Sequence, residues 1–487
     1  MINKIKDKYL ELNTAARASI WFLICSFMQR GISVLTTPIF TRLLSTSEYG
    51  QYNVFNSWLG IITVFVTLSL FNGMYTQGLI KFNEEKDILS SSMQGMTLTM
   101  VVIWSCVYFI FKDSWNNLLS LTTEQMVIMF AMIWSSAVYS FWAAEQRVDL
   151  KYKTLVAVTI IVSIAKPLIG ILLVIVSKDK VTARIFGLAL VEIICYSWMF
   201  FYHLHKGKKF FSWKYWKYAF LFSVPLIPHY LAQNLLANSD RIMIEKSVGF
   251  SEAGIYSLAY SIAQIMLLFN NALTQTISPW IMRKIKNRDV SRISNVVIST
   301  TFVIAIINIF LIALAPEIVS AFAPKSYRNA VWVIPPVALS VVFQYVYGLL
   351  ASYEFYFEKR AFISAATLIS AGLNVFLNWL LIPIFGFIAA SYTTLVCYFL
   401  LFLGHYVFVQ KISYQNFDGK KACNSKVLFS LFFGVVFIGL SFILTYEMPI
   451  LRYTILAIIG VALAINHRTV VRILKEIISK RESNGGC

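Results

Sequence analysis

Long apolar runs separated by short polar segments repeat along the whole chain. A helix that crosses a membrane needs about 20 mostly apolar residues. On this criterion we predict fourteen membrane-spanning helices, over residues 18–40, 52–74, 88–111, 123–144, 154–176, 182–202, 218–238, 254–278, 293–315, 329–351, 362–381, 387–408, 427–445 and 450–466. The runs are longer than the strands of a membrane β-barrel and lack their alternation of apolar and polar residues. The predicted fold is therefore an all-α polytopic membrane protein.

The composition supports this prediction and excludes two other classes of protein. Of the 487 residues, 58% are hydrophobic and 13% are charged, whereas a soluble domain has about 25% charged residues. Single aqueous cores stop growing beyond about 250–300 residues, so the composition excludes a soluble enzyme, and it also excludes a disordered chain. The polar residues 1–17 lead into an apolar run that is too long for a signal peptide. We therefore expect the first helix to be retained.

The formal net charge of +19 predicts the orientation of the chain. Lys and Arg concentrate in the cytoplasmic loops of membrane proteins. With the N-terminus in the cytoplasm, 30 of the 42 Lys and Arg residues fall in inside segments and ten in outside segments or at the outside ends of spans. In a soluble protein such a charge would suggest a nucleic-acid partner, but here we expect no nucleic acid, and both termini in the cytoplasm.

A short internal repeat predicts two lobes. Ser47-Glu48-Tyr49-Gly50-Gln51-Tyr52 and Ser251-Glu252-Ala253-Gly254-Ile255-Tyr256 agree at four of six positions, with an offset of 204 residues. Both hexamers sit in the same predicted outside turn of their half, and six helices separate the two, so both copies have the same orientation in the membrane. We predict six-helix lobes over residues 1–208 and 209–412, related as in parallel-repeat transporters. Residues 413–487 are predicted to add two further helices and a basic cytoplasmic tail.

Three charged residues lie deep within predicted spans, namely Arg30, Lys166 and Glu192. A charge near the bilayer centre costs at least about 2.5–3.5 kcal/mol, so each should face protein or water. Arginine can hold phosphate through two parallel hydrogen bonds, and we take Arg30 and Lys166 as candidate ligands for a diphosphate. A structural ion pair of Glu192 with Arg30 or Lys166 is the open alternative. Glu192 and Asp240 are the candidates for coupling to an ion.

Uncharged polar residues recur at helical spacing in several predicted spans. These candidate sugar-binding residues, with one base among them, are Asn234, Asn238, Arg241, Gln264, Asn271, Gln275, Asn374 and Asn378. Such side chains also form hydrogen bonds between membrane helices, and that alternative is open for each one. The six cysteines show no metal-binding spacing and the chain has no Walker A loop, so we expect no metal, no nucleotide and no other cofactor.

Three segments resemble a known family. Thr37-Pro38-Ile39-Phe40-Thr41-Arg42-Leu43-Leu44, followed by the first hexamer, resembles the first-hairpin signature of O-antigen-type polysaccharide flippases. These belong to the multidrug/oligosaccharidyl-lipid/polysaccharide exporter superfamily. The second segment, Leu373-Asn374-Val375-Phe376-Leu377-Asn378 with Ile382-Pro383, Gly386 and Ala389-Ala390, is similar to their eleventh span, although Ile388 stands where glycine is common. The third is Ser278-Pro279-Trp280 before a basic segment.

The resemblance implies a transporter rather than an enzyme. Such flippases move undecaprenyl-diphosphate-linked oligosaccharide from the cytoplasmic to the periplasmic leaflet of the bacterial plasma (inner) membrane, by alternating access of two lobes and with an ion gradient. Their basic lumen would correspond here to Arg30 and Lys166. The implied partners are the lipid-linked oligosaccharide, membrane lipid and other proteins of polysaccharide export or polymerisation.

Three alternatives to this function are open. A lipid II flippase shares the span count and a cationic cavity. A drug or cation antiporter of the same superfamily would favour buried acids, which the two deep bases and one deep acid do not. A membrane glycosyltransferase or polymerase would favour an acidic pair on a large outside loop, and the sequence has no such loop.

Overall fold

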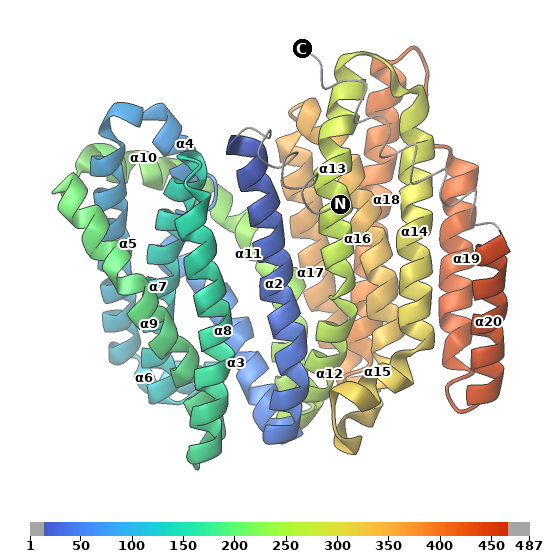
Figure 1. The fold of residues 1–487 in the computed structure, drawn as a ribbon, viewed down its shortest axis with the longest axis horizontal. Coiled ribbons are helices and arrows are strands. Elements are labelled where there is room, and N and C mark those ends of the chain that lie inside the picture. The colour runs from blue at the N-terminus through green and yellow to red at the C-terminus, as the bar shows by residue number, and fades with distance from the viewer. Residues whose placement is uncertain (1–13, 466–487) are drawn as a thin grey trace, which may run out of the picture. The chain divides into compact units, whose positions relative to one another are not determined.

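The computed structural model describes residues 14–465, and within this range every regular element is a helix (Figure 1). This confirms the predicted all-α fold. The helices group into two compact units, Met1–Gly254 and Ile255–Cys487. The boundary lies inside one helix, α12 (Phe250–Ala263). The lobe boundaries at residues 208 and 412 stay a prediction.

Among the described residues, the first unit contains ten α-helices that precede α12. They are α2 (Thr14–Leu43), α3 (Thr46–Thr67), α4 (Met74–Lys81), α5 (Lys86–Ile110), α6 (Lys112–Leu119), α7 (Thr123–Val148), α8 (Tyr152–Val176), α9 (Lys180–Gly207) and α11 (Ile227–Ser247), with the short α10 (Trp213–Ser223) before α11. Helix α9 packs against α5, α7 and α8, while α2 lies on α8 and α11 lies on α3. Apolar side chains such as Met129, Ile133 and Ile185 fill the space between α7 and α9.

The second unit is built around α16 (Ile334–Tyr356), whose side chains are buried along nearly its whole length. The other helices are α13 (Met266–Lys286), α14 (Ile293–Ala313), α15 (Ala315–Phe322), α17 (Arg360–Phe385), α18 (Ala389–Asn416), α19 (Ser425–Ile443) and α20 (Pro449–Ile465). Helix α16 packs against α13, α14 and α18, α17 packs against α18, and α19 packs against α14.

Eleven segments of the described chain are helical, long and apolar enough to cross a membrane. They coincide with eleven of the fourteen predicted spans. The remaining three predicted spans fall on α3, on α10 with α11, and on α20. These are helical too, but α3 and α11 carry many polar residues and α20 is only 17 residues long. The protein is thus a multi-pass membrane protein, and the count of fourteen stays a prediction.

Three predicted spans have different bounds in the structure, for local reasons. Helix α3 begins at Thr46, because Ser45 and Glu48 form a capping box, and it ends at Thr67, where Leu68 and Ser69 take positive φ values of 50° and 51°. The span predicted over 218–238 is broken between α10 and α11, near Pro225 and Pro228, which lack the backbone N–H that a helix interior needs. The span predicted from residue 329 begins as a 3₁₀ turn, Lys325–Trp332.

The two copies of the repeated hexamer contact each other, and the contact is reciprocal. A Cβ atom on Gly50 of α3 would lie 1.8 Å from the carbonyl oxygen of Phe250, and one on Gly254 of α12 would lie 2.1 Å from the carbonyl oxygen of Thr46. The hydroxyls of Thr46 and Ser251 are 2.9 Å apart. The repeated glycine therefore lets two backbones meet at van der Waals distance.

Gly50→Ala and Gly254→Ala should each destabilise the protein, because the new methyl group meets backbone atoms that cannot move away. Overpacking of this kind costs about 1–3 kcal/mol, so the melting temperature in detergent should fall. Gly372→Ala in α17 is the matched control, since a Cβ there meets nothing within 4 Å. Equal melting temperatures for all three variants would contradict the close approach.

Candidate functional site

Two of the predicted site residues, Lys166 and Glu192, form an ion pair between α8 and α9, and serines of α7 bond to it. The Nζ atom of Lys166 in α8 lies 2.6 Å from Oε1 of Glu192 in α9. The other carboxylate oxygen of Glu192 accepts hydrogen bonds from the Ser135 and Ser136 hydroxyls of α7, at 3.1 and 3.0 Å. The Glu192 side chain is 6% exposed and that of Lys166 is 28% exposed. The structure thus contains the Lys166–Glu192 pair, one of the two predicted alternatives. The positive charge of Lys166 is balanced by Glu192, so the pair as a whole has no net charge.

Arg30 is placed differently. It lies midway along α2 with an exposed side chain, and its guanidinium makes no ion pair or hydrogen bond with residues 14–465. The structure does not bring it to Glu192. Of the two deep bases, Arg30 is the one whose positive charge is not neutralised by a carboxylate of the described chain.

The predicted residues of α11 face α3. A Cβ atom on Gly60 of α3 would lie 3.1 Å from Oδ1 of Asn234 and 3.3 Å from Nδ2 of Asn238. Two further predicted residues, Asp240 and Arg241, are buried, and Arg241 donates a hydrogen bond to the carbonyl oxygen of Ala237 at 2.9 Å. Asn234 and Asn238 are therefore part of the packing between α11 and α3.

The predicted residues of the second unit form two groups. Asn374 and Asn378 of α17 are fully buried, and the Asn378 amide donates to Oδ1 of Asn374 at 3.3 Å and accepts from the Thr393 hydroxyl of α18. This is the interhelical hydrogen bonding left open above. The second group is more accessible: Gln264 is half-buried between α12 and α13, and Asn271 and Gln275 of α13 are exposed.

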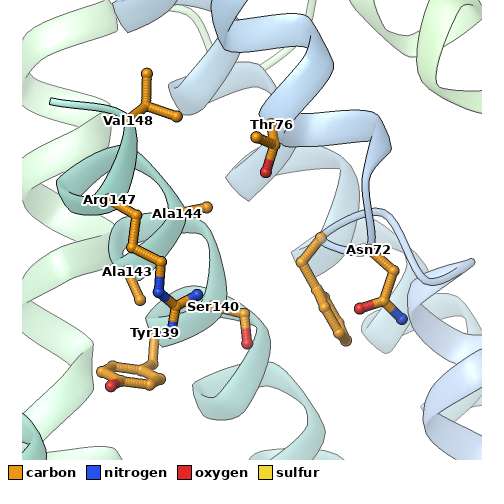
Figure 2. A pocket seen from close by; sticks show the side chains of 9 residues that line it. Asn72, Thr76, Tyr139, Ser140, Ala143, Ala144, Arg147 and Val148 are labelled. Carbon is orange, nitrogen blue, oxygen red and sulfur yellow. The ribbon is translucent and has the colours of Figure 1, made fainter. Parts of the chain in front are cut away.

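A pocket that the sequence did not reveal lies beside α7 in the first unit (Figure 2). Its volume is about 470 Å³, and it is lined by Phe71, Asn72, Thr76, Tyr139, Ser140, Ala143, Ala144, Arg147 and Val148. Arg147 lies seven residues after Ser140, on the same face of the helix. Figure 2 shows the Arg147 guanidinium beside Ser140, with Asn72 and Thr76 on the opposite wall.

Local structure explains why this pocket is open. Ala143 and Ala144 lie between the polar residues of α7 and carry the smallest side chains that a helix favours, which leaves room above them. The opposite wall is the turn between α3 and α4, which the Tyr230 hydroxyl of α11 holds by donating to the carbonyl oxygen of Asn72 at 2.8 Å. The Arg147 guanidinium is exposed and has no ion-pair partner among the described residues.

From the sequence, Arg147 belongs with the bases that set the orientation, because it lies close to the end of a predicted span. The spacing of Ser140, Ala143, Ala144 and Arg147 on one helical face was the signal for a small, polar surface. Among the described residues, no three His, Cys, Asp or Glu side chains gather as a metal site would require.

The Lys166–Glu192 pair can be tested by a double substitution. Lys166→Met should destabilise the protein by about 1–3 kcal/mol, because it leaves the buried Glu192 carboxylate without its charged partner. Adding Glu192→Gln removes that carboxylate, so the double variant should melt at a higher temperature than Lys166→Met alone. A further loss in the double variant would show that the two side chains act independently.

Comparisons with known proteins agree with one another. A model of the family described as "Polysaccharide biosynthesis protein" matches residues 15–285. The "Probable low-salt glycan biosynthesis flippase Agl15" of Haloferax volcanii is 23% identical over 389 residues, which cover 78% of this chain and 80% of that protein. A protein of the Lsg locus of Haemophilus influenzae is 21% identical over 380 residues, covering 73% and 88%.

The fold also has a solved counterpart. The structure is similar to the lipid II flippase MurJ in an inward closed conformation, with a TM-score of 0.67 and 16% sequence identity. The match covers 92% of this chain and 100% of that one. At this identity the likeness concerns the fold.

Proposed function

The chain belongs to the family of polysaccharide biosynthesis proteins, and from this premise we propose that it is a flippase for a lipid-linked oligosaccharide. The proposed substrate is an undecaprenyl-diphosphate-linked repeat unit of O-antigen or another surface polysaccharide. It moves from the cytoplasmic to the periplasmic leaflet of the bacterial inner membrane by alternating access, coupled to an ion gradient. Both termini lie in the cytoplasm, as the distribution of Lys and Arg suggests.

The observation that carries the proposal is the Arg147 pocket. A saccharide diphosphate cannot enter hydrocarbon unaided, because its charges and hydroxyls would lose their hydrogen bonds to water. The pocket offers a guanidinium without a carboxylate partner among the described residues, together with the Ser140 and Thr76 hydroxyls and the Asn72 amide. The guanidinium suits a diphosphate, and the hydroxyls and the amide suit a sugar.

The position of the pocket suggests a sequence of events. Arg147 lies at the end of α7 that the predicted topology places on the cytoplasmic side, so it would meet the diphosphate first. Arg30, midway along α2, is the base that would receive it deeper in the membrane. Lys166 would have a structural part, since Glu192 holds it at 2.6 Å. The exposed Asn271 and Gln275 of α13 would offer hydrogen bonds to the sugars.

A lipid II flippase is the second candidate function, and the fold likeness to such a protein favours it. Both substrates contain a polyprenyl diphosphate, so the arginines would serve either one. The sugars and the peptide of the two substrates differ, and transport assays with each purified lipid therefore separate the two functions.

Arg147→Ala and Arg30→Ala should each slow flipping by at least tenfold, because a diphosphate would lose a charge-assisted hydrogen bond worth about 1.5–3 kcal/mol. Flipping is measured in proteoliposomes as the fraction of undecaprenyl-diphosphate oligosaccharide that an added, membrane-impermeant glycosidase can reach. Arg147→Lys keeps the charge but not the bidentate geometry and should lose less. Lys178→Ala is the matched control, since Lys178 is exposed in the short loop between α8 and α9.

The outcomes separate the proposals. If both arginine variants flip at the rate of Lys178→Ala, the proposed site is wrong although the function stands. If the wild-type protein flips lipid II and leaves the oligosaccharide in place, the second candidate function is correct.

A further inference from the structure

A histidine and a glutamate form a buried pair in each unit of the molecule. In the first unit, Nε2 of His203 in α9 lies 2.8 Å from Oε2 of Glu145 in α7, and these side chains are 1% and 2% exposed. In the second unit, Nδ1 of His405 in α18 lies 2.8 Å from both carboxylate oxygens of Glu354 in α16. No step of the proposed function uses either pair.

The two histidines occupy matching positions in the sequence. Cys195-Tyr196 precedes His203 by six intervening residues, and Cys397-Tyr398 precedes His405 by the same number. Both glutamates lie in the last turn of their helix, α7 or α16. A similar pair thus occurs in each unit, and its surroundings differ between the two units.

The surroundings of His203 can satisfy either protonation state. The amide nitrogen Nε2 of Gln94 in α5 lies 2.8 Å from Nδ1 of His203. Neutral His203 therefore accepts a hydrogen bond at Nδ1 and donates one from its own Nε2–H to Glu145. Oε1 of Gln94 is buried and has no hydrogen-bond partner in the described part of the chain. If Nδ1 takes up a proton, a half-turn of this amide brings Oε1 to accept from the new Nδ1–H. The Glu145 bond is kept, and the long 3.5 Å bond from the Gln94 amide to the Val138 carbonyl oxygen is given up.

Among the described residues, His405 has no second hydrogen-bonding group of this kind beside it. Its Nδ1–H donates to Glu354, and its Nε2 has no partner among the described residues. The rings of Tyr347 and Phe362 lie against the imidazole, with centroids 5.3 and 5.4 Å away. A proton on Nε2 would leave a buried, charged N–H without an acceptor, which costs several kcal/mol. His405 is therefore suited to remain neutral.

The pair in the first unit also lies close to water. Nζ of Lys206 in α9 is 3.8 Å from the other oxygen of Glu145 and 3.8 Å from the Asp87 carboxylate of α5. The side chains of Lys206 and Asp87 are 35% and 44% exposed. The buried carboxylate thus lies 3.8 Å from the ammonium group of a partly exposed lysine, at the end of α7 that carries Arg147.

Other charged and titratable groups surround the pair, on every helix packed against it. They are Tyr75 of α4, Lys86 and Asp87 of α5, Arg147 of α7, Asp149 and Lys151 of the turn before α8, and Tyr202 and Lys206 of α9. Burial raises the pKa of Asp149, but hydrogen bonds from Lys151 and Lys86 outweigh it and hold this pKa below its ordinary value. Asp149 therefore stays ionised and does not compete for a proton near neutral pH.

We propose that Glu145 and His203, with Gln94, form a proton-binding site of this protein, and that the Glu354–His405 pair is its structural counterpart. The proton comes from water and forms the Nδ1–H bond of His203, and the charge of the pair changes from −1 to zero. A neutral pair costs less to bury than an isolated carboxylate. The inference deepens the proposed function, since it names the ion as a proton and gives its site.

The first test observes the proton directly and needs no substrate. Full-length protein with ¹⁵N-labelled histidine is placed in lipid bilayers, and its imidazole signals are recorded by solid-state NMR between pH 8 and pH 5. The signal that His203→Gln removes should change from neutral imidazole to imidazolium within this range. The signal that His405→Gln removes should stay neutral throughout. A His203 signal that stays neutral, or that is cationic already at pH 8, would overturn the proposal.

Gln94→Met gives a second variant in case His203→Gln does not fold. It removes the acceptor that the charged imidazole needs, so the midpoint of the His203 transition should move to lower pH by at least one pH unit. An unchanged midpoint would mean that the Gln94 amide does not take part.

The second test measures coupling. In proteoliposomes a pH gradient should raise the rate of oligosaccharide flipping at least threefold for wild type and His405→Gln, and leave the rate of His203→Gln unchanged. Stimulation of His203→Gln equal to that of wild type would overturn the coupling. If wild-type protein flips no lipid-linked sugar while His203 still titrates, the proposed function fails and the proton site stands.

Discussion

A charge that is removed from water must meet an opposite charge or a set of hydrogen bonds, and in a membrane this constraint is stricter than elsewhere. Much of the polar structure of the protein follows from it. The Glu192 carboxylate pairs with Lys166 and accepts hydrogen bonds from two serine hydroxyls, so that α7, α8 and α9 meet at one carboxylate. Glu354 and His405 join α16 to α18 in the same way. Where the constraint is met by the protein itself, the result is a fixed contact between helices.

The charged side chains without an opposite charge beside them in the protein are the ones available to a ligand. Arg30 and Arg147 are exposed and have no carboxylate partner in the described chain. Nearby small and hydroxyl-bearing residues, such as Ala143 and Ser140, keep space and hydrogen-bonding capacity beside Arg147. Fixed pairs and unpaired arginines thus divide the polar groups of the first unit into those that hold helices together and those that could hold an anion.

The sequence predicted the helices well and the contacts between them poorly, for one physical reason. Hydropathy depends on how many apolar residues lie in succession, which fixes the length and position of α7 or α9 but not the rotation of either about its axis. The partner of Glu192 was therefore undecided between Arg30 and Lys166, and Asn374 and Asn378 could line a passage or form hydrogen bonds to a neighbouring helix. Arg147 was missed because a base near the end of a span has the same appearance whether it faces water, lipid or a pocket.

The contact between Gly50 and Gly254 has a mechanical consequence. Most helix pairs interlock through ridges of side chains, which fix both the distance and the crossing angle. Here the two backbones meet at glycines, and the Thr46 and Ser251 hydroxyls lie 2.9 Å apart beside them, so any side chain at Gly50 or Gly254 would push α3 and α12 apart. Both glycines lie in the first unit, so the contact holds the beginning of α12 against α3 there.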